Sequence, residues 1–196
     1  MDSKVEMHKD KKIIVGITGA SGSCYAYSLL MKLLSLGINP DNIPVIFSKN
    51  GKDVFEYELG ANAFKEITNN YKVYNNDVFM YPFASGSTSY NSLVVAPCSM
   101  GTLARIATGI SGDLISRTAD VMLKERRQIV LITREAPLNQ IHIENMLKVT
   151  QAGGIIYPAS PSFYSKPKDM NELISTVVDR VLTLCGIENT GYKWMT

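Results

Sequence analysis

The sequence lacks long apolar runs and lacks an excess of charge of either sign. No hydrophobic stretch approaches the roughly 18 residues needed to cross a bilayer, and no signal-peptide core precedes the first predicted strand. Twenty Lys and Arg residues against 18 Asp and Glu residues give a net charge of +2. We therefore expect a cytoplasmic protein that binds neither membranes nor nucleic acid, and any anion recognition must be local.

Cysteine and histidine are also scarce. The three cysteines are odd in number and widely spaced, without a C-x-x-C pair or a nearby histidine, which excludes a disulfide framework and a zinc site. We expect no metal, and we interpret Cys98 as packing and not as a nucleophile. The only histidine outside the leader is His142, and no G-x-S-x-G motif is present, so serine hydrolase chemistry is not expected.

What is present is typical of a globular enzyme of one domain. Hydrophobic residues make up 45% of the 196 residues and charged residues 19%, which excludes extensive disorder. Strand-like apolar runs alternate with helical patterns, which predicts a three-layer, doubly wound Rossmann-like α/β fold with a mostly parallel sheet of about six strands. The expected division is a flexible leader at 1–11, one α/β domain at 12–185 and a tail at 186–196.

Glycines between the first predicted strand and the first predicted helix would let backbone amides approach a phosphate. The spacing of Gly16, Gly19 and Gly22 is not G-x-G-x-x-G, however. The second strand ends at Ser48-Lys49, without the acidic residue that holds a dinucleotide ribose. The pattern favours a mononucleotide, and a tight turn without a ligand is the alternative.

The most informative stretch is 93–137, which begins and ends with a predicted buried strand. A helix begins at Ser99 directly after the first strand, and Arg134-Glu135 directly follows the second. Because ligands of parallel α/β sheets lie at the carboxyl ends of strands, both places are candidate binding positions.

Charged residues on two predicted helices have more than one interpretation. Arg117 and Lys124 lie within about 20° of one another around the helix axis, with Asp120 between them, so they form either a binding face or a helical ion-pair ladder. Glu56 and Glu58 lie near the strand ends or on a solvated helix surface. The small polar run 84–89 is either a flexible loop or one that approaches a ligand closely.

Taken together, these residues resemble the UbiX-type flavin prenyltransferases, within the fold group of homo-oligomeric flavin-containing cysteine decarboxylases. The resemblance covers about 13–184 and is carried by several motifs in one order: Thr18-Gly19-Ala20-Ser21-Gly22, Ser48-Lys49, Ala84-Ser85-Gly86-Ser87, Pro97-Cys98-Ser99-Met100-Gly101-Thr102-Leu103, Arg117-Thr118-Ala119-Asp120-Val121, Leu123-Lys124-Glu125-Arg126-Arg127, Arg134-Glu135-Ala136-Pro137-Leu138 and Phe163-Tyr164.

The resemblance implies that reduced FMN receives the dimethylallyl group of dimethylallyl monophosphate at N5 and C6. The product, prenylated FMN, would serve a partner UbiD-type decarboxylase, and the enzyme would be a homo-oligomer, a dodecamer. The implied flavin contacts are Gly19, Ala20, Ser21, Ser48, Ser99, Met100, Gly101, Thr102 and Arg134. The implied contacts to the prenyl phosphate are Ser87, Arg117, Lys124, Arg134, Tyr164 and Arg180, with Lys124 reaching in from a neighbouring subunit.

The reaction gives three further residues a catalytic role. Breaking an allylic C–O bond leaves negative charge on the phosphate, which needs cations and a proton donor. Glu135 would act as acid and base near that phosphate, while Ser21 and Glu58 would handle protons at N5 and C6. Two alternatives are an FMN-dependent cysteine-type decarboxylase, disfavoured because the first half of the chain offers only His8, and a non-catalytic FMN-binding subunit of a decarboxylase.

Overall fold

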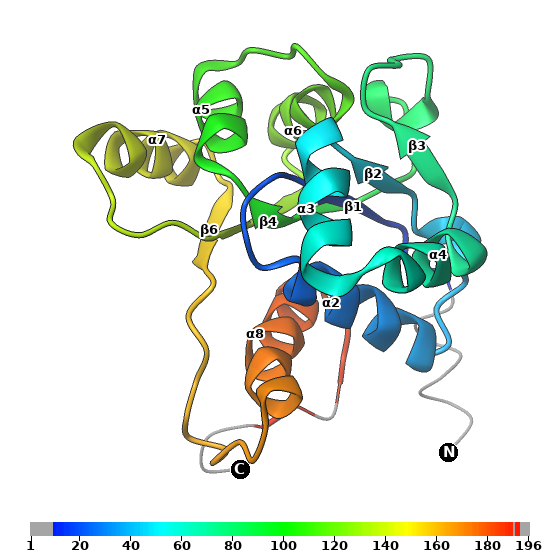
Figure 1. Cartoon of the computed structure of the whole chain (residues 1–196). Helices are drawn as coiled ribbons and strands as arrows, with labels where there is room; N and C mark the ends of the chain where they lie inside the picture. The colour runs from blue at the N-terminus through cyan, green and yellow to red at the C-terminus, as the bar shows by residue number, and fades with distance from the viewer. Residues whose placement is uncertain (1–9, 190, 193–196) are drawn as a thin grey trace.

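The centre of the fold is a six-stranded sheet in the order β3-β2-β1-β4-β5-β6 (Figure 1). This computed structural model describes residues 10–189 and 191–192, so most of the predicted leader, including His8, and part of the predicted tail lie outside the described residues. Every strand pair is parallel, which confirms the expectation of a mostly parallel sheet of about six strands. The strands are β1 (Ile13–Ile17), β2 (Val45–Phe47), β3 (Val73–Asn75), β4 (Ser92–Cys98), β5 (Gln128–Thr133) and β6 (Ile155–Pro158).

Helices cover both faces of the sheet, which confirms the three-layer architecture. One core packs α2, α3, α4 and α8 on the sheet, and a second packs α5, α6 and part of α7 on the other face. This arrangement requires strands that are apolar on both faces, as the fully buried β1 and β4 are. The helices are α2 (Ser23–Ser35), α3 (Lys49–Leu59), α4 (Ala61–Asn70), α5 (Met100–Thr108), α6 (Leu114–Lys124), α7 (Gln140–Gln151) and α8 (Met170–Leu184), with short 3-10 turns η1 (Pro40–Asn42) and η2 (Pro82–Ala84).

Two elements, α4 and β3, had no clear signal in the sequence. β3 has only three residues at the sheet edge, none of them buried, so it shows no apolar run. α4 contains three Asn residues and a Thr, which are weak helix formers, and it buries Ile67 alone. Tertiary packing against the first core therefore holds both elements. The chain also packs beyond 185, because Ile187 is buried in that core.

The strand order places β1 beside β4, where the sheet changes direction of winding. Chain connections leave the two strands toward opposite sides of the sheet, so a crevice opens outside their carboxyl ends. Among the described residues, no helix is both long and apolar enough to cross a membrane.

Candidate active site

Thr18 joins the ends of the two strands at this crevice. Its buried hydroxyl donates to the carbonyl oxygen of Pro97 at 2.7 Å and accepts from the amide of Ser99 at 2.8 Å. The start of α5 is thereby fixed to the end of β1. This role of Thr18 could not be predicted from the sequence, because a single threonine after a strand has no distinctive pattern.

Three helices begin around this crevice, and each brings the positive end of its dipole to it. Ser48 caps α3 by accepting from the amide of Gly51 at 3.0 Å. Ser99 caps α5 by accepting from the amide of Thr102 at 3.4 Å. The N-cap of α2 is Gly22, whose φ of 114° is in the left-handed region and which has no side chain to cap the helix.

Glu58, at the end of α3, supplies the missing cap of α2. Its carboxylate accepts from the amide of Ser23 at 2.8 Å and from the amide of Gly22 at 3.0 and 3.1 Å. Partial burial acts to raise the pKa of Glu58, but the hydrogen bonds from the Ser21 side chain and these amides outweigh it and lower the pKa overall. Glu58 is therefore an ionised carboxylate near neutral pH, able to accept a proton. The structure places Glu58, and not Glu56, against α2.

This pKa shift predicts how stability depends on pH. Because the pKa of Glu58 is lower in the folded chain than in the unfolded chain, its contribution to stability is complete above the ordinary value of 4.5. It should be lost as pH falls through the lower folded value. In urea unfolding between pH 7 and pH 3, the stability advantage of the wild type over Glu58→Gln should shrink below about pH 4.5. An advantage that grows on acidification would contradict the assignment.

Arg134 reaches the same turn from the end of β5. Its Nε donates to the carbonyl oxygen of Ser21 at 3.0 Å, and its Cγ would lie 3.7 Å from a Cβ added at Gly22. Ser21, Gly22, Glu58 and Arg134 thus meet although they come from three segments, and we call them the carboxyl-edge cluster. Glu135 follows directly, with an exposed carboxylate that accepts from the amide of Ala136 at 3.1 Å.

The other predicted flavin contacts lie in the turns that follow β1, β2 and β4. They would bind a ligand mainly through main-chain groups. A Cβ at Gly19 would lie 2.6 Å from Cβ of Asn50, so the turn after β1 rests directly on the start of α3. The side chains of Ala20, Met100 and Thr102 are buried, whereas Gly101 is exposed and a Cβ there would meet nothing nearer than Arg105 at 3.9 Å. An anionic ligand with a flat ring fits this arrangement, because helix N-termini converge there and the main chain at Gly101 is open.

A second group of predicted residues lies around the loop 84–90, before β4. Arg117 donates through Nε to the carbonyl oxygen of Ala84 at 3.1 Å and pairs with Asp120 at 2.9 Å. Lys124 pairs with Glu125, whose pKa is lowered by that contact. The predicted helical ion pair with Asp120 is therefore present for Arg117, whereas Lys124 pairs with Glu125 instead. We call Ser87, Arg117, Lys124, Glu125 and Arg127, with loop 84–90, the 84–90 cluster.

The two clusters lie toward opposite edges of the sheet. Ser92 and Gln128 are paired at the amino ends of β4 and β5, so the residues just before them, including Glu125 and Arg127, are at the amino edge. Arg134 follows the carboxyl end of β5, and a six-residue strand is about 20 Å long. One chain therefore does not bring Lys124 to its own Arg134.

Tyr164 and Arg180 come from two other segments, the stretch after β6 and α8. Tyr164 is 67% exposed in the stretch 159–169, which leaves β6 and is anchored beside α8 by a hydrogen bond from the amide of Ser162 to Thr176 at 3.0 Å. Arg180 is an exposed residue of α8 near Tyr157. Burial raises the pKa of Tyr157, and the charge of Arg180 acts to lower it. Tyr157 in turn lies near Tyr25 of α2.

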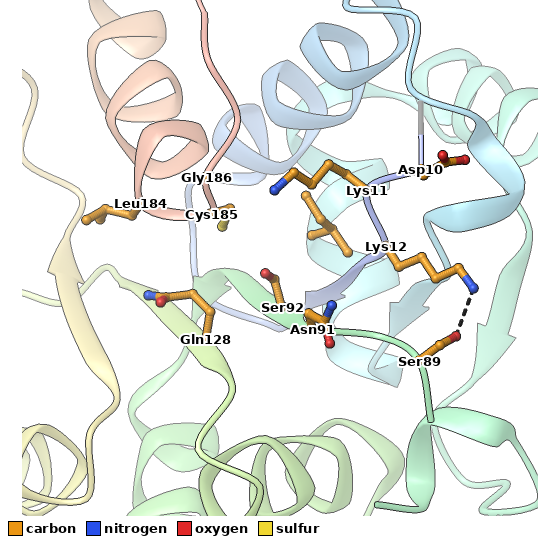
Figure 2. Close-up of a pocket in the computed structure, with 11 residues that line it drawn as sticks. Asp10, Lys11, Lys12, Ser89, Asn91, Ser92, Gln128, Leu184, Cys185 and Gly186 are labelled. Carbon is orange, nitrogen blue, oxygen red and sulfur yellow. Dashed lines mark hydrogen bonds between the residues drawn. The ribbon is translucent and has the colours of Figure 1, made fainter. Parts of the chain in front are cut away.

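Figure 2 shows a cavity of about 350 Å³ that is distinct from the carboxyl-edge cluster. It lies at the amino edge, where Lys12 donates to the hydroxyl of Ser89 at 2.8 Å and Lys11 points toward the end of α8. Its other lining residues include Asn91, Ser92 and Gln128, at the amino ends of β4 and β5. A ligand of the strand carboxyl ends cannot occupy it.

The cysteines take no part in either cluster's hydrogen bonds. Cys24, Cys98 and Cys185 are free thiols. Cys98 is fully buried, and burial raises its pKa to about 12, so the thiol is neutral and a poor nucleophile. This confirms the interpretation of Cys98 as packing. Within the described residues, no group of three His, Cys, Asp or Glu side chains is arranged to hold a metal ion.

Comparisons with known proteins show which proteins this chain is similar to. The model of the Flavoprotein family matches residues 1–182. A flavin prenyltransferase UbiX from Methanocaldococcus jannaschii is 45% identical over 94% of this chain and 99% of its own length. The crystal structure of AnUbiX in complex with FMN and dimethylallyl pyrophosphate superimposes with a TM-score of 0.89, at 38% identity, over 95% of this chain and 98% of that one. A dodecameric FMN-dependent UbiX-like decarboxylase from Escherichia coli O157:H7 has a TM-score of 0.86 at 35% identity, over 94% and 100%.

Proposed function

The chain belongs to the UbiX family of flavin prenyltransferases, and we propose that its reaction site forms where the carboxyl-edge cluster of one chain meets the 84–90 cluster of another. The chain is a prenyltransferase that makes prenylated FMN. The relatives do not favour a cysteine-type decarboxylase or a non-catalytic FMN subunit.

The two substrates fit the two clusters by charge. Reduced FMN supplies N5 and C6, the atoms that take up the dimethylallyl group. Its ring and phosphate would lie against Gly19–Ser21, Ser48 and the start of α5 at 99–102, where helix N-termini favour an anion. The second substrate, dimethylallyl monophosphate, would place its phosphate between Arg134 and the cations of the neighbouring 84–90 cluster.

Side chains of the carboxyl-edge cluster would handle the protons. Glu58 is held ionised by the α2 amides, which suits it to accept the proton released from C6. Ser21 lies between Glu58 and Arg134 and would pass a proton at N5. Glu135 is beside Arg134 and accessible to solvent, which suits it to protonate the departing phosphate.

Cations of the second cluster would stabilise the charge that develops on the leaving phosphate. Lys124 and Arg117 supply two positive charges, and Ser87 supplies a hydroxyl donor. Tyr164 and Arg180 would close the site, because the exposed stretch 159–169 begins at the carboxyl end of β6. The observation that carries the proposal is the separation of the two clusters, since they lie toward opposite edges of the sheet within one chain.

The reaction itself is tested by incubating the purified protein with reduced FMN and dimethylallyl monophosphate without oxygen. Mass spectrometry should show a flavin that has gained one five-carbon unit, and dimethylallyl pyrophosphate in a parallel reaction identifies the preferred donor. Flavin of unchanged mass in both reactions would refute the proposal.

A composite site requires a stable oligomer, and we propose a dodecamer of identical chains. The similar E. coli protein is dodecameric. In this chain, α7 and the turn before it expose apolar side chains that a second copy would cover, notably Leu138, Ile141, Ile143 and Leu147. Phe163 is also exposed, on the stretch after β6.

Placing a charge on this α7 surface should break the assembly. Leu147 is 55% exposed, so Leu147→Glu should preserve the fold of the chain yet introduce an unpaired carboxylate into the interface. Light scattering should show a lower mass at equal protein concentration. Asn62→Glu, which adds the same charge to an exposed position in the first turn of α4, should keep the wild-type mass. Equal masses for both variants would exclude the α7 surface from the interface.

Two further parts of the proposal concern the product and the compartment. Prenylated FMN would be passed to a UbiD-type decarboxylase, which pull-down of the two purified proteins with labelled product can test. A cytoplasmic location is supported by the three free thiols, which a reducing compartment maintains.

A further inference from the structure

Arg127 closes the loop 84–90 through a single guanidinium group. Its Nη2 donates to the carbonyl oxygen of Gly86 at 2.8 Å, and its Nη1 donates to the carbonyl oxygen of Tyr90 at 3.2 Å. Both bonds are partly buried, and Arg127 itself is held between the end of α6 and the start of β5. Because the guanidinium is a rigid planar fork, the two bonds fix the separation of the two carbonyl groups.

The loop fixed in this way lies directly against Lys124. A Cβ added at Gly86 would be 2.7 Å from Nζ of Lys124 and would collide with the carboxylate of Glu125. Ser87 follows Gly86, and its hydroxyl is hydrogen-bonded to that of Ser85 at 3.1 Å. The position of Ser87 relative to Lys124 therefore depends on where Arg127 holds Gly86.

The neighbouring Arg126 has a different environment although it has the same charge. Its side chain is exposed and, within residues 10–189 and 191–192, makes no hydrogen bond or ion pair. The sequence alone could not separate the two arginines, because both lie in one basic run.

We propose that Arg127 is a positioning residue for the prenyl donor. By holding the loop at Gly86 and Tyr90, it keeps the Ser87 hydroxyl and the Lys124 ammonium turned toward one phosphate group in the neighbouring chain's site. The inference rests on the proposed function, in which Lys124 binds that phosphate. It assigns to Arg127 no contact with either substrate.

The test compares Arg127→Gln with Arg126→Gln, which removes the same charge one residue away. Arg127→Gln should raise the KM for dimethylallyl monophosphate by about 10- to 100-fold, because a misplaced pair of phosphate ligands binds weakly. FMN affinity and oligomer mass should stay at wild-type values, whereas thermal stability should fall slightly because two partly buried hydrogen bonds are lost. Arg127→Lys should not rescue the KM, since an ammonium cannot supply the planar fork. Arg126→Gln should leave all these quantities unchanged.

A second comparison uses Lys124→Gln alone and the double variant Lys124→Gln/Arg127→Gln. It separates the positioning role of Arg127 from the phosphate binding by Lys124 on which that role rests. If Arg127 acts through Lys124, its replacement in the Lys124→Gln background should have little further effect on donor KM. A normal donor KM in Arg127→Gln, beside a raised KM in Lys124→Gln, would overturn the inference alone. Normal values in both would overturn the proposed phosphate site as well. Parallel losses of FMN affinity and thermal stability in Arg127→Gln and Arg127→Lys would show a structural role and also overturn the inference.

Discussion

Glu135→Gln should slow the formation of prenylated FMN by about 100- to 10,000-fold, the range expected for the loss of a general acid or base. The glutamine retains the size of the side chain but can neither donate the carboxylic proton nor accept one. Because Glu135 is exposed and bonded only to the adjacent amide of Ala136 among the described residues, the fold should be unaffected. Product formation is measured by mass spectrometry, and FMN affinity by titration of flavin fluorescence.

The FMN affinity of Glu135→Gln should equal that of the wild type. Glu66→Gln is the matched control, since Glu66 is an exposed carboxylate of α4 that accepts from the hydroxyl of Tyr27. It should keep the full rate. A loss of rate that accompanies an equal loss of FMN affinity would show that Glu135 supports binding and does not transfer a proton.

Lys124→Gln should lower the rate by about 100- to 1,000-fold, the usual result of removing one electrostatic stabiliser of a transition state. The ammonium of Lys124 is the charge that would meet the phosphate as the allylic C–O bond breaks. In the free chain it pairs with Glu125, an exposed interaction that contributes little to stability. Thermal unfolding should therefore be unchanged.

Two controls show whether the loss of rate is specific to the charge of Lys124. Lys65→Gln, at an exposed position of α4, should retain the wild-type rate. Raising ionic strength should not reproduce the effect, because a phosphate held between closely packed charges is screened less than surface pairs are. If Lys124→Gln forms product at the wild-type rate, the 84–90 cluster does not bind the leaving group.

Strands and helices could be predicted from the sequence wherever their own residues form an apolar run or a helical repeat. β1, β4 and β5 are buried on both faces, so their sequences are apolar runs. The helices between them have apolar residues at helical spacing. β3 and α4 could not be predicted, because one is short and exposed and the other consists mostly of weak helix formers. Their positions follow from packing against distant residues, which no local pattern reports.

The candidate site was only partly predictable for a related reason. Ser48 and Ser99 could be found because helix caps follow strands in a recognisable order. The role of Glu58 depends on a left-handed Gly22 that lacks a capping side chain, a backbone feature that residue types do not specify. The distinction between Arg126 and Arg127 depends on which one faces loop carbonyls 40 or so residues earlier.

The separation of the two clusters is the central feature of the account, and co-assembly of two inactive variants tests it most directly. Chains with Glu135→Gln and chains with Lys124→Gln, each nearly inactive alone, are produced together and purified as mixed oligomers. If every site combines the carboxyl-edge cluster of one chain with the 84–90 cluster of another, about one quarter of the sites in a random equal mixture regain both residues. The mixed oligomers should then form prenylated FMN at about a quarter of the wild-type rate. A rate no higher than that of the separate variants would show that each site is built from a single chain and would contradict the account.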